Sequence, residues 1–133
     1  MATALWPLQK AVITALKGDS AFMSLVTGVY DRVPSDRPLP YVTLGSITEH
    51  ASDSHTDRGL DSYLVLHIWS EYEGNKEAAQ ILEALDAVLD RQTLPVIGWQ
   101  NVSIAFESAD TVGDPNPDIR HINVRYRVWL TKI

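Results

Sequence analysis

The sequence contains no cysteine. This absence excludes a disulfide framework and any metal site built on thiolates, and it removes cysteine as a catalytic nucleophile. No apolar run approaches the ~20 residues that a helix needs to cross a bilayer, so we expect no membrane partner. Basic residues are also few, because 11 Lys and Arg stand against 17 Asp and Glu, which gives a formal net charge of −6. This balance argues against a broad nucleic-acid-binding face, since such faces neutralise phosphates with Lys and Arg.

Motifs for nucleophilic catalysis and for nucleotide binding are missing as well. The chain has no Gly-x-Ser-x-Gly nucleophile elbow, no Gly-x-Gly-x-x-Gly loop and no P-loop. We therefore expect neither an enzyme activity nor a cofactor.

One polar segment, residues 50–59, holds four side chains of the types that ligate metals. These are His50, Asp53, His55 and Asp57. Imidazole and carboxylate groups bind Zn²⁺ or Mn²⁺, but the spacing matches no ligand motif. The small polar residues between them are typical of a mobile loop. Two interpretations stay open, a metal-dependent enzyme or ligand binder that uses this loop, and a solvated loop without a site. We favour the solvated loop.

Three segments have helical character. Residues 4–17 repeat apolar side chains at helical spacing, and Pro7 fits this helix only in its first turn. A short helix that carries Phe22 and ends at Gly28 follows. The longest helix lies within residues 75–90, where the apolar residues recur at i, i+3, i+4 and i+7 and form one stripe. The members of this stripe are Ala78, Ile81, Leu82, Leu85, Val88 and Leu89.

Five segments have the patterns of strands. They are residues 29–33, 41–49, 60–70, 102–107 and 121–130. Gly45 marks a bulge in the second of them. The strand 60–70 is apolar on both faces, so a second layer must cover it. The last strand alternates strictly, with Ile122 to Leu130 pointing inward at every second position. The sequence therefore predicts a single α+β domain over residues 1–133. Its mostly antiparallel sheet of four to five strands carries the long helix and the N-terminal helices on one face.

The outward side of this sheet holds the candidate interface residues. They are Tyr63, Trp69, His121, Arg125, Arg127 and Trp129. Trp and Arg dominate the binding energy of many protein interfaces. The alternatives stay open: the arginines pair with Glu107 across the sheet, which we favour slightly, or the tryptophans are buried under the N-terminal helices with Trp6 as a lid. A nucleic-acid binder that uses Arg120, Arg125 and Arg127 ranks third because of the net charge.

Several stretches, taken in order, resemble the tail-completion or tail-terminator proteins of long-tailed bacteriophages and related gene transfer agents. The matching residues are Val29-Tyr30-Asp31-Arg32-Val33-Pro34, Pro38-Leu39-Pro40-Tyr41-Val42-Thr43-Leu44-Gly45, Asp57-Arg58-Gly59, Leu64-x-Leu66-x-Ile68-Trp69-Ser70, Gly74, Glu77-Ala78, Phe106-Glu107-Ser108-Ala109, the turn Asp114–Asp118, Arg120-His121 and Arg125-Tyr126-Arg127. The resemblance extends over essentially the whole chain. One departure is Ile122-Asn123, where the family pattern has a small residue after the Arg-His pair.

The resemblance implies a structural virion protein and no enzyme. Such a protein forms a ring, commonly of six subunits, that caps the tail tube and joins it to the head. The implied partners are further copies of the chain, the tail tube protein, the head–tail connector or neck proteins, and DNA that passes through the lumen without specific binding. The implied location is the head-proximal end of the tail, after assembly in the host cytoplasm. Residues 50–59 are expected to form a docking loop that orders on contact. A head-side neck or stopper protein is the nearest alternative.

Overall fold

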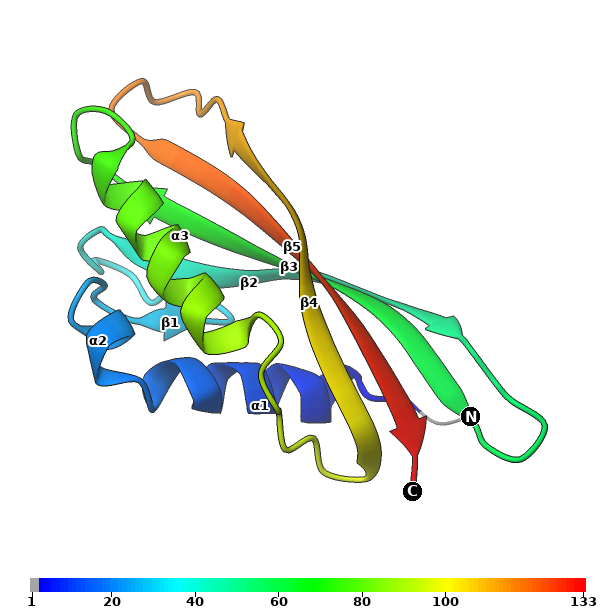
Figure 1. Cartoon of the computed structure of the whole chain (residues 1–133). Coiled ribbons are helices and arrows are strands. Elements are labelled where there is room, and N and C mark those ends of the chain that lie inside the picture. The colour runs from blue at the N-terminus through cyan, green and yellow to red at the C-terminus, as the bar shows by residue number, and fades with distance from the viewer. Residues whose placement is uncertain (1–2) are drawn as a thin grey trace.

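Five strands form one twisted sheet, and three helices pack on one of its faces, in the computed structural model, which describes residues 3–133 (Figure 1). The elements are α1 (Leu5–Lys17), α2 (Ser20–Met23), β1 (Val29–Tyr30), β2 (Tyr41–Ala51), β3 (Gly59–Ser70), α3 (Lys76–Leu89), β4 (Trp99–Val112) and β5 (Arg120–Lys132). The strand order is β1-β2-β3-β5-β4, with β1 parallel to β2 and all other neighbours antiparallel. The predicted α+β fold with a mostly antiparallel sheet is confirmed.

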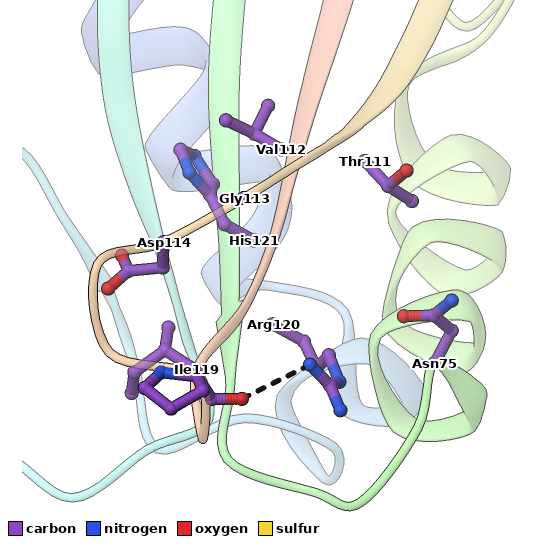
Figure 2. Close-up of a pocket in the computed structure, with 9 residues that line it drawn as sticks. Asn75, Thr111, Val112, Gly113, Asp114, Ile119, Arg120 and His121 are labelled. Carbon is purple, nitrogen blue, oxygen red and sulfur yellow. Dashed lines mark hydrogen bonds between the residues drawn. The ribbon is translucent and has the colours of Figure 1, made fainter.

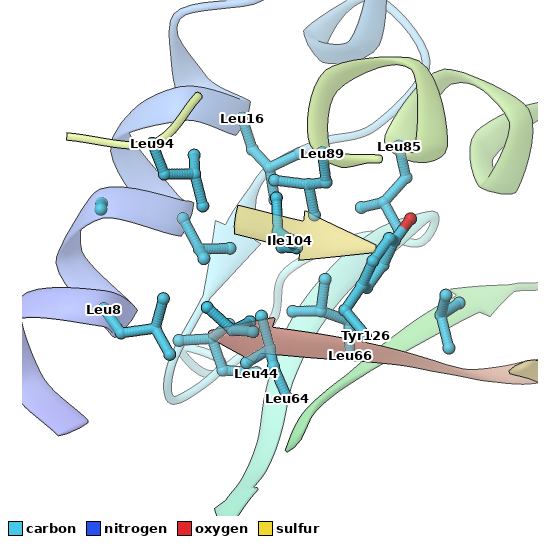
Figure 3. Close-up of a cluster of buried hydrophobic side chains, with 14 of the residues drawn as sticks. Leu8, Leu16, Leu44, Leu64, Leu66, Leu85, Leu89, Leu94, Ile104 and Tyr126 are labelled. Atoms are coloured by element: carbon cyan, nitrogen blue, oxygen red, sulfur yellow. The ribbon is translucent and has the colours of Figure 1, made fainter. Parts of the chain in front are cut away.

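The core lies between the helices and the inward side of the sheet (Figure 3). The α3 stripe buries Ala78, Ile81, Leu85 and Leu89, as its spacing predicts. Every inward residue of β5 from Ile122 to Leu130 is buried as well. The largest of them is Tyr126, whose hydroxyl donates a hydrogen bond of 2.9 Å to Asp86 Oδ1 on α3. Burial, and then the hydrogen bond to Asp86, raise the pKa of this phenol far above its usual range.

The helices follow the predicted segments, with one difference in length. Pro7 lies in the first turn of α1, where a missing N–H is harmless. The second helix ends at Met23 and not at Gly28. The chain leaves the helix early because the Thr27 N–H donates to the Pro40 carbonyl at 2.8 Å, which brings the segment alongside β2. None of the helices within residues 3–133 is long and apolar enough to cross a membrane.

The strands differ more from the prediction, since four of them are longer than expected and the first is shorter. Residues 29–33 contribute only Val29–Tyr30, because only these two residues pair with β2. In contrast, β2 continues to Ala51, so His50 stands on a strand and not in the loop. On β4 the side chain of Phe106 is 41% exposed. The cause is its position, because β4 is an edge strand of the sheet.

Gly45 marks a bulge, as predicted. The register of β2 against β3 shifts between Leu44 and Ile47. A Cβ at Gly45 would lie 2.6 Å from His67 Nε2 and 2.9 Å from the Val65 carbonyl oxygen. The absence of a side chain therefore lets the His67 ring lie close over β2.

Candidate interaction face

The sheet face opposite the helices, here called the open face, is covered by no other element of residues 3–133 (Figure 1). Its two central strands are β3 and β5, which pair in register from Gly59↔Thr131 to Ser70↔Arg120 without a bulge. Their side chains on this face are Asp61, Tyr63, Val65, His67, Trp69, His121, Asn123, Arg125, Arg127 and Trp129. All six predicted interface residues therefore lie together, and the layer that was expected over the second face of β3 is missing from the described part of the chain.

The arginines lie among aromatic rings and carboxylates at one end of the open face. Arg127 donates from Nε and Nη2 to the two oxygens of Asp61, at 2.9 and 2.5 Å. Its guanidinium lies 4.7 Å from the centre of the Trp129 ring. Arg125 lies 4.1 Å over the Tyr63 ring and 3.3 Å from Glu107 Oε1. The hydrogen bonds from Arg127 hold the pKa of the Asp61 carboxyl below its usual value.

These pairs decide between two of the earlier interpretations. Pairing with Glu107 is confirmed for Arg125, whereas the partner of Arg127 is Asp61 of the neighbouring strand. The guanidinium groups of Arg125 and Arg127 are each matched by a carboxylate, whereas Arg120 donates to the Pro117 carbonyl oxygen at 3.3 Å. Two of the three arginines of the alternative nucleic-acid-binding row are therefore neutralised, which argues against that interpretation.

The two tryptophans of the open face are held differently. Burial under the N-terminal helices is wrong for both, because the helices pack on the opposite face, and Trp6 on α1 is 65% exposed. Trp69 stacks on His121 with 3.8 Å between ring centroids, and its Nε1 donates to Thr43 Oγ1 at 3.0 Å. Trp129 is 36% exposed. Trp69 is therefore held by contacts with neighbouring residues of the sheet, whereas Trp129 is partly exposed to solvent.

A histidine cluster occupies the other end of the open face. His67 Nδ1 lies 2.8 Å from His121 Nε2 and 2.5 Å from Asn123 Oδ1. Burial, and next the neighbouring His67, lower the pKa of His121, while Asp114 and the hydrogen bond to Asn123 oppose this shift. His121 also lines a pocket of about 350 Å³ at the turn between β4 and β5, together with Asp114 and Arg120 (Figure 2).

The metal-like side chains of residues 50–59 do not converge. His50 on β2 packs edge-on against Tyr63, with 6.1 Å between ring centroids. Asp53 Oδ1 accepts the Gly59 N–H at 3.1 Å, and Asp57 Oδ2 accepts the Thr56 hydroxyl at 3.2 Å. Among residues 3–133, no three or more His, Cys, Asp or Glu side chains are grouped to hold a metal ion. The aspartates therefore stabilise the turn and assemble no site with His55.

The residues of the family resemblance occupy structural positions. Asp31, Arg32 and Pro34 lie in the connection between β1 and β2, which ends at Pro40. The rings of Tyr30 and Tyr41 meet edge to face, 6.0 Å apart. Ser70 Oγ donates to Glu77 Oε1 at 2.7 Å, and so ties the end of β3 to the first turn of α3. Glu107 and Ser108 stand at a register shift between β4 and β5.

Three polar residues of the open face were not among the predicted candidates. His67 and Asn123 complete the histidine cluster, and Asp61 binds Arg127. The alternation of β3 and β5 places all three on the outward side. Their contacts depend on β3 lying beside β5, which is a pairing that no short stretch of sequence reveals.

Comparisons with known proteins agree with one another. A model of the family described as "Tail completion protein gp17" matches residues 10–131. A chain in the solved structure "Virion of native gene transfer agent (GTA) particle" is 26% identical, with a TM-score of 0.89, over 98% of this chain and 99% of that one. The "Structure of bacteriophage SPP1 gp17 protein" is 20% identical, with a TM-score of 0.60, over 100% and 97% of the two chains, which is a likeness of fold. No curated protein matches the chain in sequence.

Proposed function

Because this chain belongs to the tail completion protein gp17 family, a family of structural virion proteins and not of enzymes, we propose that it is a tail-terminator subunit. Copies of the chain form a ring of six that caps the tail tube and joins the tail to the head. The observation that carries this proposal is the family match over residues 10–131. The partners are other copies of the chain, the tail tube protein, and the connector or neck proteins of the head.

The open face is the surface that we assign to contacts between copies. A closed ring of identical subunits needs a heterologous interface, in which one surface of each copy meets a different surface of the next. Trp and Arg are residue types that often anchor such contacts. On the open face, Trp129 is partly exposed and lies against Arg127. Arg127 is already fixed by Asp61, so little side-chain freedom is lost on binding.

The hairpin loop between β2 and β3 is the part that we assign to docking on the tube or on the neck. In Figure 1 this loop projects away from the helices at the far end of the hairpin. The Ser54 N–H donates to the Asp57 carbonyl at 2.8 Å, and Asp53 Oδ1 accepts the Gly59 N–H, so the loop has a turn of its own before it meets a partner.

The net charge is consistent with a passage for DNA. A chain with a formal charge of −6 offers little attraction to phosphates, so DNA slides through the lumen without being held. The ring then lies at the head-proximal end of the tail, after assembly in the host cytoplasm.

Capping of growing tubes tests this function. The cognate tail tube protein is polymerised with and without a molar excess of this chain, and tube lengths are measured by negative-stain electron microscopy. We expect shorter tubes with added density at one end. Tubes of unchanged length with bare ends would contradict the proposal.

A further inference from the structure

We propose that the turn before α3 in one copy of the chain, residues 71–75 and here called the α3 turn, binds in an apolar groove between α1 and residues 93–97 of the next copy. The inference rests on the proposed ring, and it adds a second pair of surfaces to the contacts of the open face. Two different surfaces of one chain that meet in this way form a heterologous contact, the kind that a ring of identical subunits requires.

The α3 turn presents one aromatic ring to solvent from a fixed backbone. Tyr72 is 48% exposed. Its N–H donates to Ser70 Oγ at 3.1 Å, and the same hydroxyl donates to Glu77 Oε1 on α3 at 2.7 Å. Gly74 completes the turn with a φ of 91°, which favours glycine. Tyrosine often anchors protein interfaces, and a turn that is already fixed loses little freedom when a partner buries it.

The groove lies where the chain leaves α3 and passes α1 (Figure 1). Its volume of about 370 Å³ lies within the range of concave sites that enclose small ligands. Its apolar lining consists of Pro7, Ala11 and Ala15 of α1 with Leu94, Pro95 and Ile97. Ile97 is 76% exposed, so a ring bound there removes apolar surface from water. Thr14 and Thr93 add hydroxyls that can hydrogen-bond to a phenol, whereas Trp6 does not line the groove.

Charge distinguishes the occupant. Lys10 lines the groove, and the lining includes no acidic residue among residues 3–133. The α3 turn carries exposed carboxylates on both sides of Tyr72, at Glu71 and Glu73. None of these three charged side chains forms an ion pair within the part of the chain that the structure describes. An apolar groove with one cation therefore complements an aromatic ring between two anions.

The open face is a poorer occupant of the same groove. Its exposed tryptophan, Trp129, lines a hollow together with Arg91. Docking of this region would bring the Arg91 cation towards Lys10, and like charges brought together weaken a contact.

A copy cannot fill its own groove, because the two surfaces lie at opposite ends of α3. The α3 turn ends directly before Lys76, and residues 93–97 follow Leu89. The 14 residues of this helix span about 21 Å. Each copy therefore offers its turn to one neighbour and its groove to another, and the series ends where the ring closes.

Cross-linking between two variants tests the contact. The chain has no cysteine, so single cysteines report one position each. Glu73→Cys and Thr93→Cys proteins are mixed with the cognate tail tube protein and treated with a short bis-maleimide. We expect a product of twice the chain mass from the mixture and little from either variant alone. In the control, Leu25→Cys replaces Thr93→Cys and should give only the background product, because Leu25 is exposed outside both surfaces.

Charge reversal gives a second test, read by light scattering as the concentration at which half of the protein is assembled. Lys10→Glu, and separately Glu71→Lys/Glu73→Lys, should each raise this concentration at least tenfold. All three substitutions in one chain should restore most of the assembly, because opposite charges meet again. Tyr72→Ala should weaken assembly more than Tyr72→Phe, which keeps the ring.

Two results would overturn the inference and leave the tail-terminator function intact. One is shortened, capped tubes without the mixed cross-link. The other is a combined charge variant that assembles no better than its two parents. Loss of tube capping in Lys10→Glu with unchanged assembly would assign the groove to the tube protein and also overturn the inference. The proposed function fails separately, if wild-type protein leaves the tubes at full length with bare ends.

Discussion

Single residues on the open face are fixed by contacts between neighbouring strands. Arg127 is bound by Asp61, Arg125 lies between Tyr63 and Glu107, and Trp69 is stacked on His121. A surface whose side chains are ordered before contact loses less conformational entropy on binding than a mobile one. This order makes the face suited to a permanent interface.

The close packing around Gly45 can be tested by adding a single methyl group. Gly45→Ala places a Cβ 2.9 Å from the Val65 carbonyl oxygen, which is backbone and cannot move away alone. We expect a loss of about 1–3 kcal/mol in the free energy of unfolding, measured by urea denaturation. Gly113→Ala is the matched control, because a Cβ there meets no atom within 4 Å. Equal stability of the two variants would show that the bulge tolerates a side chain.

His121 gives a pH dependence. Its pKa in the folded protein lies below the ordinary 6.5, because burial and then His67 disfavour the charged ring. Below about pH 6.5 the unfolded chain therefore binds more protons at this residue than the folded chain does. The free energy of unfolding should fall as the pH is lowered from about 6.5 towards the folded pKa, while above 6.5 this residue has little effect.

Urea denaturation at pH 7.5 and pH 5.5 measures this slope. His121→Gln should flatten it, whereas His55→Gln, a change in an exposed loop residue, should leave it as in the wild type. A slope that His121→Gln leaves unchanged would assign the pH dependence to other groups.

At the scale of elements, the stability of the fold depends on the buried apolar stripe of α3. Leu85 is fully buried on it, while Leu82 on the same helix is partly exposed. Leu85→Ala should lower the free energy of unfolding by about 2–5 kcal/mol, since it leaves a cavity in a packed core. Leu82→Ala should cost clearly less, as measured by circular dichroism in urea. Similar losses in both variants would mean that the helix packs differently.

The elements also show what sequence reasoning can reach. The α3 stripe and the inward row of β5 were predictable, because a buried face imposes a period of 3.6 or 2 on the chain. Gly45 was predictable as a bulge, since glycine interrupts an otherwise regular strand. The lengths of the strands were not predictable, because β2 and β4 are extended by pairing with strands whose residues no local pattern identifies.

The candidate site was predictable in composition and less so in geometry. The strict alternation of β5 put Arg125, Arg127 and Trp129 on the outward side correctly. The contact of His67 with His121 joins residues 54 positions apart and requires β5 to insert between β3 and β4. No local pattern contains that information. His50 and the loop aspartates are close in sequence but do not converge in the structure. The strand β2 continues to Ala51, so His50 lies on the strand while Asp53 and Asp57 lie in the loop after it.

At the scale of the whole molecule, one face of the sheet is covered and the other is uncovered within residues 3–133. The helices bury the inward face, and the open face presents aromatic rings and paired arginines. A sheet face that carries aromatic rings and arginines is suited to contact with another molecule. We propose that the neighbouring copy in the ring covers this face.

The measurement that tests this account most directly is the molar mass in solution, determined by light scattering behind size-exclusion chromatography over a range of concentrations. Wild-type protein should form a closed ring of about six copies, visible in negative stain. Trp6→Glu, a charge placed on the exposed tryptophan of α1, should keep that mass, whereas Trp129→Glu on the open face should give monomers. An unchanged mass for Trp129→Glu, or a wild type that stays monomeric at every concentration, would contradict the assignment of the open face to the ring interface.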